Sequence, residues 1–190
     1  QAQVVDVSNK QDMMNWIDEI VQNHRLDLVI ANAGISGGTG GRQEGEPITE
    51  ARKIFDVNVM GVFNTIEPVL QAMQNQEVPS GQRHKGQIAI VSSLAGFRGW
   101  PSSPAYSASK GAVRFYGEAL RGALSGSDIA INVICPGFVK SRITDQNDFP
   151  MPFKMEADKA AKIIARGLSK NKGRICFPLP MHFMSWFIGI

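Results

Sequence analysis

Hydrophobic residues follow two alternating patterns along this chain. Five short apolar runs predict strands, and they cover residues 2–8, 26–34, 86–93, 129–137 and 173–180. Four stretches with helical spacing predict helices. The first helix should begin after residue 8, and the other three should cover residues 48–73, 105–123 and 157–168. Apolar strands that alternate with helices are typical of a parallel sheet covered on both faces. The pattern therefore predicts an α/β fold in a single domain over residues 1–190.

Several residues refine the predicted helices. Ser8 and Gln11 have the spacing of a capping box, so we expect the first helix to begin there. Its inward face should carry Met13, Ile17, Ile20 and Val21. Pro68 predicts a kink in the second helix. The helical spacing of the third helix is carried by Ala105, Ala108, Ala112, Phe115, Ala119 and Ala123.

Composition and charge exclude several classes of protein. A hydrophobic content of 43% and a charged content of 19% are ordinary for a globular protein. The net charge of +3 is small and the basic residues are scattered, which argues against a nucleic-acid partner. Cys135 and Cys176 lie beside apolar residues at expected strand ends, which favours buried free thiols over a disulfide and a reducing compartment such as the cytoplasm. His182 has no second ligand at metal-binding spacing, so we expect no metal site.

The segment "YSASK" places Tyr106 and Lys110 four residues apart on an expected helix. Residues at this spacing share one helix face, so the phenol and the ammonium can point into the same site. A neighbouring cation favours the phenolate and lowers the pKa of a tyrosine, which suits proton transfer. Taken alone, the pair is more typical of a half-buried tyrosine beside a solvated lysine on an amphipathic helix.

Small and polar residues gather where the expected strands end. Asn32 to Gly34, Ser92 and Ser93, and Pro136 with Gly137 each follow an apolar run. In open parallel sheets, ligands bind beyond the carboxyl ends of the strands. Alternation along the strand places Ser92 and Ser93 on opposite faces.

These motifs, taken in order, resemble the short-chain dehydrogenase/reductase superfamily. "NAG" at 32–34 is similar to its strand-end NNAG, and Asn58 in "FDVNVMG" is similar to its helical active-site asparagine. Ser93 precedes Tyr106 by thirteen residues, as the catalytic serine does in the family, and "YSASK" matches YxxxK. "CPGFVKSRI" resembles the PGxVxT segment, with Ser141 in place of threonine.

The resemblance implies a Rossmann-like doubly wound parallel sheet with strand order 3-2-1-4-5-6-7, in which residues 2–8 are the third strand. The TGxxxGxG loop that binds the cofactor pyrophosphate has no counterpart here. The glycine-rich run at 34–47 follows the wrong strand and has Glu44 where a glycine is needed, so we interpret it as a surface loop. We therefore expect two strand-helix units to be absent before residue 1, and the domain to be incomplete at its C-terminus as well.

The resemblance also implies an NAD(P)-dependent oxidoreductase. Hydride would pass between the nicotinamide ring and a carbonyl or alcohol carbon, with Tyr106 as the general acid or base. Lys110 would lower the pKa of Tyr106 and bind the nicotinamide ribose, while Ser93 would hold the substrate oxygen. Asn58 would anchor a water molecule that connects Lys110 to solvent. The alternative function is a non-catalytic nucleotide-binding or regulatory protein with the same fold.

Binding residues are implied in the same way. Besides Tyr106 and Lys110, the expected cofactor contacts are Asp6, Asn32, Ala33, Gly34, Pro136, Gly137, Val139 and Ser141. From the residues alone, the structural alternative is the stronger one here, with Gly34 and Gly137 as turn glycines and Asp6 as a helix cap. The cofactor is NAD or NADP, and the residues that decide between them are not in this sequence. Besides Ser93 and Tyr106, Phe97 and Phe149 are expected to face an apolar substrate, and packing against the core is the alternative.

Assembly follows from the resemblance and from the C-terminal segment. The family pairs its two long helices, here residues 48–75 and 104–124, across a twofold axis, so we expect a homodimer or homotetramer with Phe115 or Tyr116 at the contact. The last 16 residues contain no Asp, Glu, Lys or Arg. They are consistent with a substrate-site flap, a subunit contact or a peripheral membrane anchor.

Overall fold

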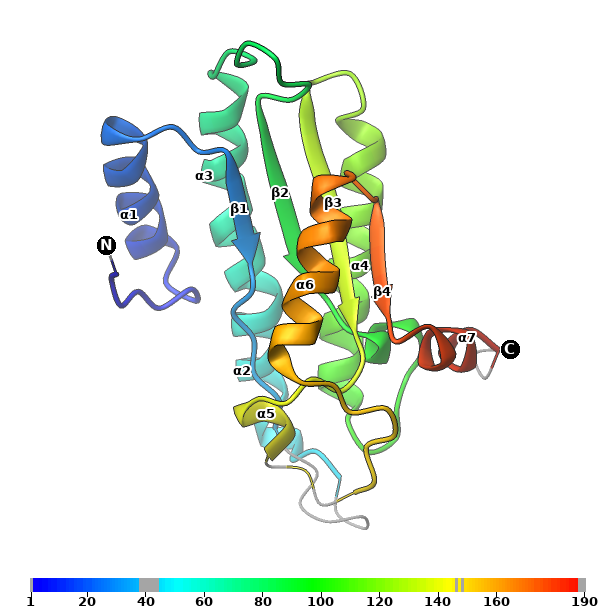
Figure 1. The fold of residues 1–190 in the computed structure, drawn as a ribbon. Coiled ribbons are helices and arrows are strands. Elements are labelled where there is room, and N and C mark those ends of the chain that lie inside the picture. The colour runs from blue at the N-terminus through cyan, green and yellow to red at the C-terminus, as the bar shows by residue number, and fades with distance from the viewer. Residues whose placement is uncertain (1, 38–44, 146, 148, 188–190) are drawn as a thin grey trace.

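A computed structural model describes residues 2–37, 45–145, 147 and 149–187 of the chain. Four parallel strands form one sheet in the order β1-β2-β3-β4, and they are Leu28–Ala31, Gly86–Val91, Ile129–Pro136 and Arg174–Phe177. Helices cover both of its faces (Figure 1). The α/β class and the parallel sheet predicted from the apolar runs are therefore confirmed. The glycine-rich run, which was predicted to be a surface loop, falls largely in residues 38–44, outside the described residues.

One face of the sheet packs on the two long helical segments. The first comprises η1 (Ile48–Glu50), α2 (Ala51–Phe55), the π-helical turn η2 (Asp56–Met60) and α3 (Gly61–Gln74), and the second is α4 (Pro104–Ala123). The core on this side joins Ile88, Ile90 and Ile131 of the sheet to Ile66 and Val113 of the helices. Burying these branched side chains contributes most of the stability of this layer. Helix α1 (Lys10–Asn23) packs against the outside of α3 (Figure 1).

The opposite face is covered by α6 (Ala157–Ser169), which crosses in front of β3 in Figure 1. Here Ala89, Ile134 and Ile175 of the strands pack with Ala160 and Leu168 of the helix. Three shorter helices complete the described structure: η3 (Leu94–Phe97), α5 (Arg142–Asp145) and α7 (Leu179–Phe187). No helix among the described residues is long and apolar enough to cross a membrane.

The prediction of a strand at residues 2–8 is wrong. Residues 2–6 have no regular secondary structure, and the side chain of Val4 is fully exposed. A strand requires a neighbour that pairs with its backbone, and the described part of the sheet pairs β1 only with β2. The segment is held by α3 instead, because Asn64 Nδ2 donates to the carbonyl oxygen of Val7 at 2.9 Å.

The expected start of the first helix is also corrected. Asn9 is the N-cap of α1, and its Oδ1 accepts from the N–H groups of Gln11 and Asp12. The N–H and hydroxyl of Ser8 both donate to the carboxylate of Asp6, so Ser8 forms a turn before the helix. Val21 is 37% exposed and does not face inward as predicted.

The second helix departs from α-helical hydrogen bonding at η2, where the N–H of Gly61 donates to the carbonyl of Asp56. Pro68 lies further along, inside α3.

The buried side of α4 differs from the row of apolar residues that has helical spacing in the sequence. Ala105 is buried, but Ala108, Ala112, Ala119 and Ala123 are exposed, and Phe115 is 63% exposed. The buried face consists of Ala105, Ser107, Ser109, Lys110, Val113, Arg114 and Gly117. Several of these side chains are polar, so the apolar periodicity pointed to the side of the helix that faces away from the sheet.

Candidate active site

The carboxyl ends of β1, β2 and β3 lie beside the first turns of α4, at the lower end of the sheet in Figure 1. Ser93 follows β2, and its side chain lies near enough to that of Tyr106 to lower the pKa of the phenol. The hydroxyl of Ser93 also accepts from the N–H of Ala95 at 3.1 Å and donates to the carbonyl oxygen of Pro136 at 3.4 Å. A serine and a tyrosine held in this way can contact the same substrate oxygen. Ser92 points elsewhere and donates to the backbone carbonyl of Lys110 at 2.7 Å.

Lys110 places a buried ammonium group behind this pair. Its side chain is only 4% exposed, and Nζ lies 3.0 Å from the carbonyl oxygen of Val91, to which it donates. Burial lowers the pKa of Lys110 to about 8, because a charged group is less stable away from water. A Cβ at Gly34 would lie 3.0 Å from Nζ, so the glycine leaves this side of the ammonium open.

The pKa of Tyr106 differs from the expectation. The tyrosine is half-buried, and burial raises its pKa above the ordinary value, the hydrogen bond with Ser93 lowers it, and the charge of Glu46 raises it. We expected Lys110 to lower this pKa. Its ammonium lies 6.0 Å from the centroid of the phenol ring and is directed at Val91, so burial is the larger effect.

Asn58 occupies the π-helical turn η2 and is completely buried. Its amide pairs with the backbone of Ile35, accepting from the N–H at 2.8 Å and donating to the carbonyl at 2.9 Å. It also donates to Ser109 Oγ, whose hydroxyl donates in turn to the carbonyl of Tyr106 at 2.8 Å. Asn58 therefore connects the segment after β1 to the helix that carries Tyr106 and Lys110. The water relay remains a prediction.

The other expected cofactor residues are spread over four segments. Asn32 and Ala33 follow β1 and are exposed. Pro136 ends β3, and the N–H of Gly137 donates to the carbonyl of Phe177 at 2.7 Å. Val139 forms a bridge with Met155, and the N–H of Ser141 donates to Thr144 Oγ1 at the start of α5. Asp6 lies in the exposed turn before α1, where hydrogen bonds from Ser8 lower its pKa.

The two expected substrate residues lie in different surroundings. Phe149 packs edge-on against Phe138, with ring centroids 5.8 Å apart, beside the segment that follows β3. Phe97 packs against His182 and lies under the guanidinium of Arg114, 4.4 Å from its ring centroid. Phe97 thus belongs to a packed cluster with Arg114 and α7, which corresponds to the core-packing alternative.

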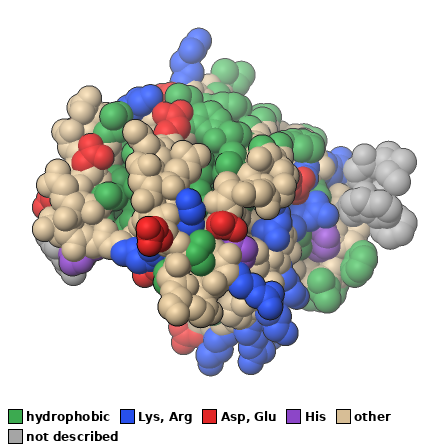
Figure 2. Space-filling view, turned by 90° about the horizontal axis from the view of Figure 1, so that it is seen from above, with side chains coloured by type: hydrophobic (Ala, Val, Ile, Leu, Met, Phe, Trp, Pro, Cys, Tyr) green, Lys and Arg blue, Asp and Glu red, His purple; other side chains and the backbone are tan. Residues whose placement is uncertain are grey.

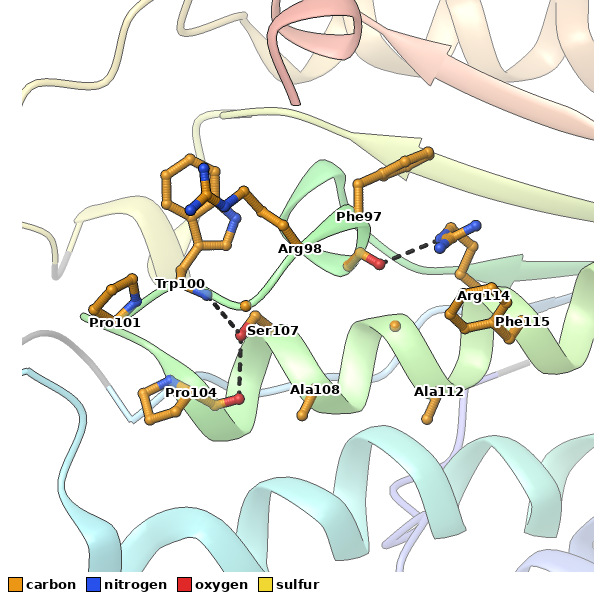
Figure 3. A pocket seen from close by; sticks show the side chains of 13 residues that line it. Phe97, Arg98, Trp100, Pro101, Pro104, Ser107, Ala108, Ala112, Arg114 and Phe115 are labelled. Atoms are coloured by element: carbon orange, nitrogen blue, oxygen red, sulfur yellow. Dashed lines mark hydrogen bonds between the residues drawn. The ribbon is translucent and has the colours of Figure 1, made fainter. Parts of the chain in front are cut away.

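An open groove of about 730 Å³ lies between the segment 96–101 and α4. Figure 3 shows Trp100, Pro101, Ala108, Ala112 and Phe115 along it. Ser93, Tyr106 and Lys110 do not line it, so the groove is separate from the candidate active site. It borders the exposed face of α4.

Two residues of this region were missed by the sequence analysis. Ser109 lies inside the "YSASK" motif, but nothing in its spacing indicates that it connects Asn58 to the backbone of Tyr106. Glu46 lies 59 residues before Ala105, to whose N–H its carboxylate is bonded. No local pattern relates residues that are so far apart in the sequence.

The chain resembles known proteins in sequence and in fold. Residues 1–150 match the short chain dehydrogenase family. An uncharacterized oxidoreductase of Myxococcus xanthus is 41% identical over 153 residues, which are 80% of this chain and 57% of that protein. Cyclopentanol dehydrogenase of Comamonas sp. is 34% identical over 143 residues, 75% of this chain and 54% of that enzyme. The chain thus spans little more than half the length of these relatives.

The fold matches solved structures at lower identity. A short chain dehydrogenase from Burkholderia cenocepacia, solved in complex with NADP, superimposes with a TM-score of 0.81 at 19% identity. The match covers 98% of this chain and 75% of that one.

Proposed function

Because the chain belongs to the short chain dehydrogenase family, we propose that it transfers hydride between NAD or NADP and the carbonyl or alcohol carbon of a small molecule. The observation that carries the proposal is that the side chains of Ser93 and Tyr106 interact at the strand ends, with the buried ammonium of Lys110 close by. The three residues come together at the carboxyl ends of parallel strands, where this class of fold binds its ligands. Their function is proton transfer at the substrate oxygen.

The segment after β1 suits a dinucleotide. Gly34 has no side chain, which leaves space beside Lys110 Nζ and Asn58 Oδ1. A Cβ at this position would lie 3.0 Å from Nζ and 3.2 Å from Oδ1. A ribose hydroxyl is a suitable partner for an ammonium that, within the described residues, donates only to the carbonyl of Val91. We assign Asn32, Ala33 and Gly34 to the same ligand, with Pro136, Gly137, Val139 and Ser141 on the opposite side of the site. The solved relative that contains NADP has the same fold.

The proposed chemistry separates hydride transfer from proton transfer. When bound, the nicotinamide ring accepts or supplies the hydride. In reduction, the phenol of Tyr106 gives its proton to the carbonyl oxygen, and in oxidation the phenolate takes the hydroxyl proton back. Ser93 donates a hydrogen bond to the substrate oxygen where negative charge develops. Lys110 stabilises the phenolate once Tyr106 has given up its proton. Asn58 holds the strand end and the helix at a fixed separation.

We propose an apolar substrate. The Phe138–Phe149 pair is the aromatic contact beside the expected nicotinamide segment, and Phe153 and Met155 continue the same stretch of chain. Apolar side chains around a few polar catalytic groups favour apolar alcohols and ketones. One of the relatives is a cyclopentanol dehydrogenase, whose substrate is of this kind.

We also propose a homodimer or homotetramer that forms through α3 and α4. Phe115 is exposed on α4, while Phe55 of α2 and Met60 of η2 are exposed on the helical segment that continues into α3. The groove beside Ala108 and Ala112 borders the exposed face of α4. Figure 2, which shows the molecule from above, has apolar side chains gathered toward this side, while basic and acidic side chains are interspersed elsewhere. Cys135 and Cys176 lie opposite each other on the neighbouring strands β3 and β4, and both have free thiols. Free thiols at this distance support a cytoplasmic location.

The proposal is tested by replacing Tyr106 with phenylalanine in the full-length protein. The oxidation of a set of alicyclic alcohols is measured through the formation of NADH or NADPH. Tyr106→Phe should lower turnover at least about a hundredfold, because the general base is lost. Tyr116→Phe is the matched control, since Tyr116 is the other of the two tyrosines and packs against Phe63 on α3. Full turnover in Tyr106→Phe, or equal losses in both variants, would contradict the proposed role.

A further inference from the structure

Glu46 is a buried acid with an unusual set of partners. It lies between the segment after β1 and η1, and it is 6% exposed. Within the described residues, no lysine or arginine forms an ion pair with it. A buried carboxylate requires hydrogen bonds in place of water, and it finds them at the N-terminus of α4.

The first turn of α4 provides these bonds. Glu46 Oε2 accepts from the N–H of Ala105 at 2.6 Å, and both carboxylate oxygens accept from the N–H of Tyr106 at 3.2 Å. Ser103, at the N-cap position, makes no side-chain capping bond, and Pro104 has no N–H. Glu46 therefore replaces the usual cap, although it is distant in the sequence. Its negative charge also lies at the positive end of the helix dipole.

Glu46 is itself fixed from two sides. Its N–H donates to the carbonyl of Ser102 at 3.0 Å, just before α4. On the other side, a Cβ at Gly37 would lie 2.9 Å from Glu46 Cγ, so the chain that follows β1 packs directly on this side chain. Glu46 thus connects the segment that carries Asn32 to Gly34 with the helix turn that carries Tyr106.

From this geometry we infer that Glu46 is a positioning residue for the proposed reaction, because it fixes the backbone of Tyr106 relative to the proposed cofactor segment. The inference rests on the proposed function, since it concerns the same tyrosine. Catalytic groups must be held within fractions of an ångström of the productive geometry. Two N–H bonds to one buried carboxylate provide such a restraint at the residue whose phenol transfers the proton.

A second consequence concerns the charge of Glu46. The groups that act on Tyr106 are the hydroxyl of Ser93 after β2, the ammonium of Lys110 on α4, and the carboxylate of Glu46, whose charge raises the pKa of the phenol. The charged residues of α2, Arg52 and Lys53, are exposed. Removing the charge of Glu46 should therefore lower the pKa of Tyr106, which a residue with only a structural role would not do.

The test compares Glu46→Gln, Glu46→Ala and the matched control Glu50→Gln in the full-length protein. Glu50 lies four residues along the same segment, and within the described residues its carboxylate has no hydrogen bond or ion pair to α4. Alcohol oxidation requires the phenolate, so kcat should rise with pH around the pKa of Tyr106. We expect Glu46→Gln to move the midpoint of this profile to lower pH, Glu46→Ala to lower kcat at least about tenfold, and Glu50→Gln to change neither.

Unchanged kcat and an unchanged midpoint in both Glu46 variants would overturn the inference. If Glu46→Ala does not fold, the milder Glu46→Gln decides by the same readouts.

Amide hydrogen exchange separates the inference from the proposed function. The N–H groups of Ala105 and Tyr106 should exchange faster in Glu46→Ala than in the wild type and in Glu50→Gln, whether or not the protein is an oxidoreductase. If Tyr106→Phe retains full turnover while these amides lose protection, the proposed catalytic role of Tyr106 fails and the capping contact stands. If their exchange is unchanged, Glu46 does not restrain Tyr106 and the inference fails.

Discussion

Lys110 is a lysine that the fold removes almost completely from water. Its ammonium has the carbonyl of Val91 as its hydrogen-bond partner, and burial brings its pKa from an ordinary 10.5 to about 8. A lysine in this state costs stability when it is charged. The cost is consistent with a functional site, where side chains are kept in unfavourable surroundings because the chemistry requires them.

This cost predicts how stability depends on pH. The folded pKa lies below the unfolded one, so the unfolded chain binds more protons between about pH 8 and pH 10.5. The free energy of unfolding should therefore rise with pH through this window, and the penalty is fully present below it. In urea titrations without cofactor, the stability of the wild type relative to Lys110→Met should increase by on the order of 2–3 kcal/mol between pH 7 and pH 10.5. A difference that is constant with pH would show that Lys110 keeps its ordinary pKa.

At the scale of the element, α4 combines a close approach to the sheet with an exposed outer face. Gly117 lies on its buried side, where a Cβ would be 2.6 Å from Val133 Cγ2 and 2.9 Å from Ile90 Cδ1. Gly122 lies near the end of the same helix, and a Cβ there would meet nothing within 4 Å. The close approach brings the backbone of α4, and with it Tyr106 and Lys110, up against the ends of β2 and β3.

The two glycines form a matched pair for a stability test. Gly117→Ala should destabilise the protein by about 1–3 kcal/mol, because the added methyl group requires β2 and β3 to move away from α4. Gly122→Ala should stabilise it by roughly 0.5–1 kcal/mol, because alanine is the better helix former and has room. Chemical denaturation of both variants measures the difference. If the two substitutions had the same effect, helix propensity rather than packing would govern this side of α4.

At the scale of the whole molecule, large apolar side chains are exposed on α4 and on the helical segment before α3, namely Phe115, Phe55 and Met60. Large apolar side chains are usually covered when they cluster, and a twofold dimer covers the same patch on both subunits. Of the two aromatic residues expected to compete for this face, Phe115 is 63% exposed, whereas Tyr116 is half-buried against Phe63.

We therefore predict that Phe115→Glu shifts the full-length protein from a dimer or tetramer toward monomer or aggregate, because one substitution places two charges in an isologous contact. Light scattering after gel filtration at micromolar concentration measures the change. Val21→Glu, at an exposed apolar position on α1, is the control and should leave the assembly intact. A wild-type monomer at this concentration would contradict the proposed assembly.

Local pattern determined much of this protein by itself. The apolar runs at 26–34, 86–93, 129–137 and 173–180 all became strands of one parallel sheet, because a strand buried on both faces must be apolar along its length. The same pattern placed the NAG segment, Ser93 and Pro136 at strand ends. Tyr106 and Lys110 share one side of α4 because a spacing of four is a property of any α-helix.

Tertiary structure decided what depends on distant partners. Residues 2–8 have a strand-like sequence, but β-structure needs a paired neighbour, and in the described structure this segment pairs with no strand. The buried side of α4 is the polar one, because Lys110 and Ser109 bond to groups of β2 and η2 that spacing within the helix cannot reveal. The raised pKa of Tyr106 and the capping of its helix by Glu46 depend on burial and on contacts between residues about sixty positions apart. Hydrophobic periodicity reports which side of an element can be buried, and only the folded chain determines which residues meet there.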